Sequence, residues 1–201
     1  MDPIPWDNWP DRLWGFGMTT GGHVNFCVGA LLRDGLRVAP FERHAEGDGR
    51  LRAAGMTWDQ WRGWYERVVG DEVLREARRL LGSGSSSSPP GDAARSAVEL
   101  WDGPDAVRTE LASMPPPGRP EDPPRDQFRP IRGDRDDRSD PLWSDLQQFR
   151  GRVPHFWVYL VRYPFIVADA VRPAAIVMSD RVPLNPALFR ATLIDAVRRL
   201  A

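Results

Sequence analysis

A charged, proline-rich segment over residues 115–141 limits how this chain can fold. It contains eight prolines, and Phe128 and Ile131 are its only large apolar residues. Such a segment cannot bury enough apolar surface to offset the entropy lost on ordering it. The Gly/Ser-rich stretch 82–91 has the composition of a flexible linker. We therefore predict that residues 82–139 form a long, flexible and Pro-rich excursion from the folded core.

The parts on either side of this excursion carry most of the apolar residues. The Trp-rich residues 1–81 form the N-terminal part and residues 140–201 the C-terminal part. A separate domain of about 60 residues is marginal in stability, because it buries too little surface. We therefore predict one domain, in which both parts share a single core.

Helix signals are clearest at two places. Thr57 and Gln60 have the spacing of a capping box and predict a helix over 57–81, which Gly82 ends. Asn185 can cap a final helix over 186–200. The same kinds of signal predict shorter helices over 23–32 (where a strand is the alternative), 93–101, 105–114 and 141–149.

Strand signals are confined to the C-terminal part. Residues 156–161 are rich in β-formers, and residues 174–178 are a candidate partner strand. We therefore predict a mostly helical α+β fold. Its small sheet, of two or so strands near 155–178, is packed by the helices 57–81 and 186–200.

Composition excludes several classes of function. All 27 basic residues are Arg, which rules out a Walker A loop, a Schiff-base lysine and a protein kinase. Arg in place of Lys, with much Ala, Gly and Pro, is typical of a GC-rich bacterial genome. The net charge of −1 argues against a nucleic-acid partner.

Cysteine usage and hydropathy predict the compartment. Cys27 is the single cysteine, so no intrachain disulfide and no CxxC site can form. The first residues lack the pattern of a secretory signal, and the longest apolar stretch, 153–178, is interrupted by Arg162, Asp169 and Arg172. We therefore expect a cytoplasmic protein with no membrane partner.

Tryptophan is the most over-represented residue type, with nine copies. Trp58, Trp61 and Tyr65 share one helix face and fit a core, whereas Trp64 points away from it. Since Trp and Arg are enriched in binding hot spots, the surplus indicates a surface for a partner. The candidate interface residues are Trp6, Trp9, Trp14, Trp64 and Arg12.

The glycine-rich stretch 15–23 is a second candidate site. Converging backbone N–H groups and two hydroxyls could hold a phosphate or carboxylate, and a helix that starts near His23 would add its dipole. The alternative is a structural loop packed beside Trp14 and Phe16, and no apolar strand is evident before it. The candidate anion-binding residues are Gly17, Thr19, Thr20, Gly21, Gly22 and His23.

Other arrangements of reactive residues are weaker. Cys27 could pair with His44 or His155, but a cysteine between Phe26 and Val28 is expected to be buried and inert. The histidines lack metal-ligand spacing, so we expect no metal site and no cofactor. Several acidic residues lie beside arginines and are interpreted as solvated: Glu42, Glu66, Glu72 and Glu110.

These observations favour a non-enzymatic protein–protein interaction module, such as a bacterial adaptor, regulatory subunit or assembly component. Its partner and its oligomeric state are not identified by the sequence. The alternative is an enzyme of an unrecognised class, in which the loop 15–23 binds an anion and His44 is the acid or base. A binder of single-stranded nucleic acid, using Arg and Trp, is a third hypothesis that the balanced charge disfavours.

Overall fold

The computed structural model describes residues 14–43, 46–81, 90–116 and 141–201. Three predicted interface residues, Trp6, Trp9 and Arg12, lie outside the described residues, as does His44. Within these ranges, none of the helices combines the length and the apolar character needed to cross a bilayer.

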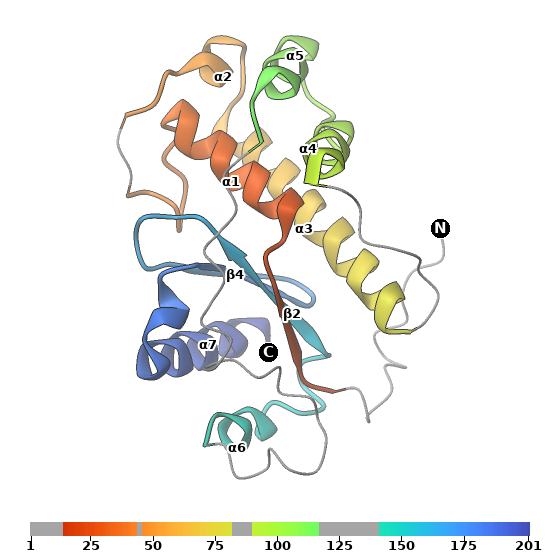
Figure 1. The fold of residues 1–201 in the computed structure, drawn as a ribbon, viewed down its shortest axis with the longest axis vertical. Coiled ribbons are helices and arrows are strands. Elements are labelled where there is room, and N and C mark those ends of the chain that lie inside the picture. The colour runs from red at the N-terminus through yellow and green to blue at the C-terminus, as the bar shows by residue number, and fades with distance from the viewer. Residues whose placement is uncertain (1–13, 44–45, 82–89, 117–140) are drawn as a thin grey trace.

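A four-stranded mixed sheet lies at the centre of the fold (Figure 1). Its strand order is β1-β2-β4-β3, and β2 (Phe156–Val161) is parallel to both of its neighbours, β1 (Phe16–Thr19) and β4 (Ala175–Ser179). The edge strand β3 (Ala168–Val171) is antiparallel to β4. The predicted α+β class is confirmed.

The expectation of two or so strands was too low. The sequence predicts β2 and β4 but misses both edge strands, β1 and β3. Each of these has only four residues. Strand β1 exists through its pairing with a segment far along the chain, since Phe16 is opposite Phe156. No local pattern can report such a pairing.

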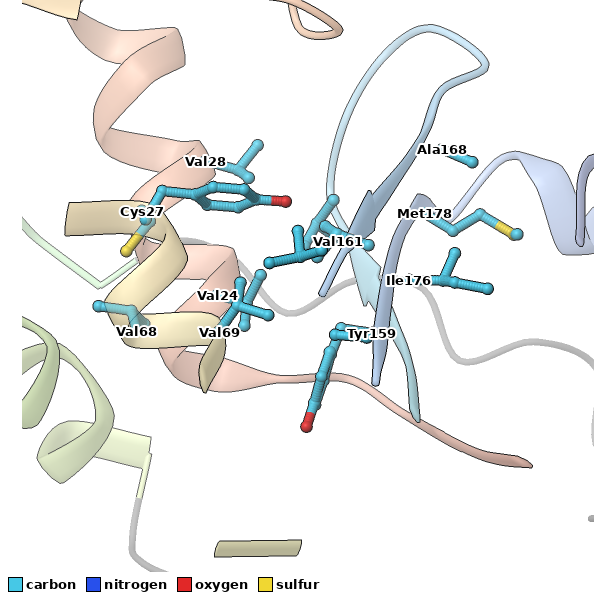
Figure 2. Packing of buried hydrophobic residues seen from close by; sticks show 14 of the residues in the cluster. Val24, Cys27, Val28, Val68, Val69, Tyr159, Val161, Ala168, Ile176 and Met178 are labelled. Atoms are coloured by element: carbon cyan, nitrogen blue, oxygen red, sulfur yellow. The ribbon is translucent and has the colours of Figure 1, made fainter. Parts of the chain in front are cut away.

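Helices cover both faces of the sheet (Figure 1). On one face, α1 (Gly22–Asp34) packs on β2 and α3 (Trp58–Leu80) packs on β4. On the other face, α7 (Pro186–Leu200) packs on β3 and β4. Figure 2 shows Val24 of α1 and Val161 of β2 among the side chains that fill the space between sheet and helices.

Local signals explain where the long helices begin. The capping box is confirmed, because Thr57 N donates to Gln60 Oε1 (2.8 Å) and Gln60 N donates to Thr57 Oγ1 (3.3 Å). Asn185 caps α7 by accepting from the N–H of Leu188 at 3.0 Å. Segment 23–32 is a helix rather than a strand, and α1 ends at Gly35, which has the left-handed φ of 75°.

Short helical segments connect the longer elements: α2 (Arg50–Ala53), α6 (Pro141–Gln147) and the 3-10 turn η4 (Val182–Leu184). Helix α6 follows its sequence signal, whereas α2 was not predicted. The carboxylate of Asp34 is fully buried against the start of α2. It accepts from the N–H of Leu51 at 2.7 Å and from the N–H of Arg52 at 3.1 Å. Amides at the start of a helix have no backbone partner within the helix, and Asp34 supplies one here.

Helices α4 (Pro90–Glu99) and α5 (Asp105–Ser113) fall within 82–139, the range predicted as an excursion. Both belong to the same layer as α1, against which α4 packs. This middle part of the chain adds buried side chains to the core shared by the N- and C-terminal parts: Ala97, Trp101, Val107 and Leu111.

The core accounts for much of the tryptophan surplus. Trp64 is fully buried, and its Nε1–H donates to the carbonyl oxygen of Ala97 at 2.7 Å. Trp14 is 7% exposed and donates to the carbonyl oxygen of Val153 at 2.8 Å. Both were predicted as interface residues, and both instead lie inside the fold.

Trp58, at the start of α3, was predicted to be buried, and that prediction was wrong. Trp58 was assigned to the core face but is 58% exposed. Helix α3 is buried on two sides, because Trp64 lies between Phe26 of α1 and Trp101 after α4. A single apolar stripe therefore does not describe which of its tryptophans are inside.

Candidate functional site

The predicted anion-binding loop is a strand, a turn and a helix start. Strand β1 ends at Thr19, and α1 begins at Gly22. The strand that was expected to be missing before the turn is therefore β1 itself. The turn follows the carboxyl end of a strand in a parallel pair, which is where α/β folds commonly bind ligands. All six predicted residues fall here: Gly17, Thr19, Thr20, Gly21, Gly22 and His23.

The first turn of α1 has backbone donors with no partner among the described residues. Among the described residues, no side chain caps this helix, and its first turn contains no acidic residue. In the first helical hydrogen bond, the N–H of Asn25 donates to the carbonyl oxygen of Gly21 at 2.8 Å. The N–H groups of Gly22, His23 and Val24 precede that bond. Such amides, with the positive end of the helix dipole, favour a bound anion.

Tyr159 of β2 packs directly on this turn. Strand register places it opposite Thr19. A Cβ atom on Gly21 would lie 2.6 Å from Cδ1 of the Tyr159 ring. Because Gly21 has a φ of −54°, which other residues also adopt, the requirement for glycine is steric. Glycine thus brings the helix start against the aromatic ring.

The Tyr159 hydroxyl is buried without a hydrogen-bond partner among the described residues. Figure 2 shows it pointing away from the apolar side chains around Val24 and Val161. Burial, followed by the charges of Glu72 and Glu76, raises the pKa of Tyr159 well above its usual range. The phenol is therefore neutral and presents an unused donor. An unsatisfied buried hydroxyl costs about 1–3 kcal/mol, so its presence needs an explanation.

A polar triad lies beside the turn, formed by His23, Glu72 and Arg75. His23 Nδ1 is 2.5 Å from Glu72 Oε2, and Arg75 Nη1 is 2.9 Å from His23 Nε2. A guanidinium can only donate, so Nε2 is the accepting nitrogen of the contact with Arg75. The close approach of Nδ1 to Glu72 Oε2 lacks hydrogen-bond geometry, because neither atom has a hydrogen-bond partner among the described residues. Arg75 also pairs with Asp71 at 2.7 Å.

Glu72 was predicted to be solvated, and that prediction was wrong. It is 9% exposed, and His23 is 6% exposed. Its position in α3 contained the signal, because it follows the buried Tyr65, Val68 and Val69 by seven, four and three residues. A carboxylate on the core face of a helix is a candidate functional group, since it needs a partner.

Glu76 lies one helical turn beyond Glu72 on α3. Burial, together with the charge of Glu72, raises the pKa of Glu76, while Arg79 at 3.0 Å opposes the shift. After burial, the charges of Glu72 and Glu76 also raise the pKa of Tyr159.

The other predicted reactive residues that the structure describes, Cys27 and His155, are not gathered at this site. Cys27 is fully buried in α1, and burial raises the pKa of its thiol well above the usual range. His155 is buried against Trp157, with ring centroids 4.6 Å apart, before the start of β2. In the described part of the chain, no three His, Cys, Asp or Glu side chains are grouped so that they could hold a metal ion.

Comparison with protein-family models, with curated proteins and with solved structures finds no match to this chain. The functional argument therefore rests on the residues at the β1–α1 turn.

Proposed function

We propose that the protein binds a small molecule, whose acidic group lies at the first turn of α1. The observation that carries this proposal is the Tyr159 hydroxyl, a buried donor with no partner among the described residues. The ring of Tyr159 lies against Gly21, at the start of a helix whose first amides are not capped by any described residue. Buried polar groups are normally hydrogen-bonded, so a buried hydroxyl without a partner, on a ring that packs against a helix start, supports an acceptor that arrives from solution.

Arg75 gives the site a route to solvent. Its side chain is 38% exposed, while its guanidinium reaches the buried His23. An anionic group that enters along α3 would meet this cation first. The planar guanidinium is suited to carboxylates and phosphates, because it donates two parallel hydrogen bonds.

A titration of ¹⁵N-labelled protein with small carboxylates, phosphates and amino acids tests this proposal. We expect at least one of these ligands to shift the amide signals of Gly22 and His23 saturably. Tyr159→Phe and Arg75→Gln should each weaken that ligand. Arg67→Gln is the matched control, because Arg67 lies on the same helix and pairs with the exposed Asp102. If nothing in the panel binds, or if both variants bind normally, the proposal is wrong.

A second candidate function is the non-enzymatic protein–protein interaction module that the sequence favours. The specific observation in its support is an open groove of about 660 Å³ beside the exposed indole of Trp58. Two arginines also line it, Arg37 and Arg52. An exposed Trp with Arg neighbours has the composition of an interaction hot spot.

This second candidate is tested with a partner that co-purifies with the chain and is then prepared separately. Trp58→Ala should weaken its binding at least tenfold, and Trp6→Ala or Trp9→Ala should weaken it as well. Equal binding by all three variants would exclude these surfaces. Trp58 is exposed, so its replacement should leave the fold intact.

A further inference from the structure

We infer that a small pocket between α1 and the end of α5 binds a short monocarboxylate with a branched aliphatic or phenyl body. The apolar body occupies the pocket, and the carboxylate pairs with Arg33. None of the residues that line this pocket belongs to the β1–α1 turn, so the inference goes beyond the proposed function.

The pocket has a volume of about 140 Å³. From α1 it is lined by Phe26, Gly29, Ala30 and Arg33, which are three and four residues apart and therefore lie on one face of the helix. Residues 114–116, which lead from α5 towards α1 (Figure 1), line its other side. A protein cavity of about 150 Å³ with apolar walls binds benzene, so this volume fits a body of about six carbon atoms.

The walls of the pocket are mostly apolar. Phe26 supplies an aromatic ring that is 2% exposed, and Gly29 and Ala30 supply no polar side chain. Met114 supplies a thioether, and the two prolines that follow it have no N–H to donate. Such walls favour an apolar ligand body, because they cannot replace the hydrogen bonds that a polar body makes with water.

Arg33 is the charged side chain of the pocket. It is exposed, and it makes no hydrogen bond or ion pair with another described residue. Two other arginines near this end of α1 are already paired: Arg52 with Asp34 and Arg50 with Glu110, both at 2.9 Å. The guanidinium of Arg33 is therefore available to a ligand.

This single cation selects the charge of the ligand. A guanidinium donates two parallel hydrogen bonds to a carboxylate, whose one negative charge matches its own. An amine would be repelled by Arg33, and a neutral ligand would leave its donors unused. The lining thus favours an apolar body that carries one carboxylate.

The methyl group of Met114 is the reporter for the test, because it lines the pocket, whereas Met178 is buried in the sheet. In protein labelled with ¹³C-methyl methionine, isovalerate or benzoate should shift the Met114 signal saturably and leave that of Met178 unchanged. Isovaleramide and benzamide, which lack the charge, should bind about 3- to 10-fold more weakly than the matching acid. Acetate, which lacks the apolar body, should bind at least about tenfold more weakly than isovalerate.

Two variants locate the two parts of the ligand. Gly29→Leu should fill the pocket and weaken the binding of the acid at least about tenfold, because no room remains for the apolar body. Its matched control is Gly70→Leu, at a helical glycine of α3 with nothing within 4 Å of its Cβ, which should bind normally. Arg33→Gln should reduce the preference for the acid over its amide to less than about twofold. Arg95→Gln, at an exposed position of α4 outside the pocket, should keep the full preference.

The outcomes decide for or against this pocket separately from the β1–α1 turn. If neither isovalerate nor benzoate shifts Met114 saturably, the inference is wrong. It is also wrong if the amides bind as tightly as the acids, or if Arg33→Gln keeps the full preference for the acid. Should Gly29→Leu fail to fold, the comparison of acids, amides and acetate on the wild-type protein still decides. Tyr159→Phe and Arg75→Gln should leave the Met114 shift unchanged, so either site can fail without the other.

Discussion

Replacing Tyr159 with Phe separates stability from binding. The hydroxyl has no hydrogen-bond partner among the described residues and is fully buried. Its removal recovers a desolvation cost of about 1–3 kcal/mol, offset in part by weaker packing around the small space that the oxygen leaves. We therefore expect Tyr159→Phe to raise the free energy of unfolding by about 1 kcal/mol. For a chain of this length, that corresponds to a rise in Tm of about 2–4 °C.

The same substitution at Tyr163 should have the opposite effect. The Tyr163 hydroxyl donates to the carbonyl oxygen of Arg43 at 2.7 Å and accepts from the N–H of Arg43 at 3.1 Å. Tyr163→Phe removes both bonds, and we expect it to lower the free energy of unfolding by about 1–3 kcal/mol. Since both variants lose one phenolic oxygen, the difference in sign reports only whether that oxygen is partnered.

Urea unfolding followed by circular dichroism measures both free energies, and calorimetry measures ligand affinity. Tyr159→Phe should be more stable than the wild type and yet bind the ligand about 2- to 10-fold more weakly, the loss of one neutral hydrogen bond. A Tyr159→Phe protein that is less stable than the wild type would refute the reasoning, because the hydroxyl would then have a partner within the fold.

Three further predictions follow from the same contacts. Gly21→Ala should lower the free energy of unfolding by about 1–3 kcal/mol in urea titrations, since its Cβ would overlap the Tyr159 ring. The matched control Gly70→Ala, with nothing within 4 Å of its Cβ, should be neutral or raise it by about 1 kcal/mol. In the native protein, the thiol of Cys27 should react with a soluble thiol reagent only as fast as the protein unfolds, because it is buried and its pKa is raised. Rapid native labelling would contradict its burial. The raised pKa of Glu76 above 4.5 means that the folded protein binds more protons than the unfolded chain just above that pH, so stability falls as pH rises there. The Glu76→Gln variant lacks this loss, so its free energy of unfolding relative to that of the wild type should increase between about pH 4 and pH 6. If the difference between the two free energies stayed constant with pH, the raised pKa of Glu76 would be contradicted.

The parts of the fold predicted correctly depend on local interactions. Thr57 bonds to Gln60, and Asn185 bonds to Leu188, so each helix start is encoded within four residues. Strand β1 is different, because Phe16 becomes part of a sheet only when Phe156 is placed beside it. Such long-range pairing carries no periodic signal within the strand itself.

The placement of the tryptophans depends on which helices pack together. Helical periodicity puts Trp58 and Trp61 on one face, but it cannot say that a second helix covers the side where Trp64 lies. Trp64 is buried because α1 and the segment after α4 meet there. Trp58, in the first turn of α3, is left exposed.

Only part of the candidate site was predicted from the sequence. The glycine turn and His23 were predicted, because glycines before a helix are a recognisable pattern. Tyr159 reaches the turn only through its register with Thr19 across the sheet. Glu72 was misassigned because neighbouring arginines suggested a solvated face, although its spacing from Tyr65 placed it inward.

The most direct test of the central claim is where a ligand perturbs the backbone. In an NMR titration of ¹⁵N-labelled protein with the amino acid or acid that binds most tightly, the largest saturable shifts should fall on the amides of Gly22 and His23. Shifts confined to other segments, or no saturable shift in this first turn of α1, would contradict the site proposed for this protein.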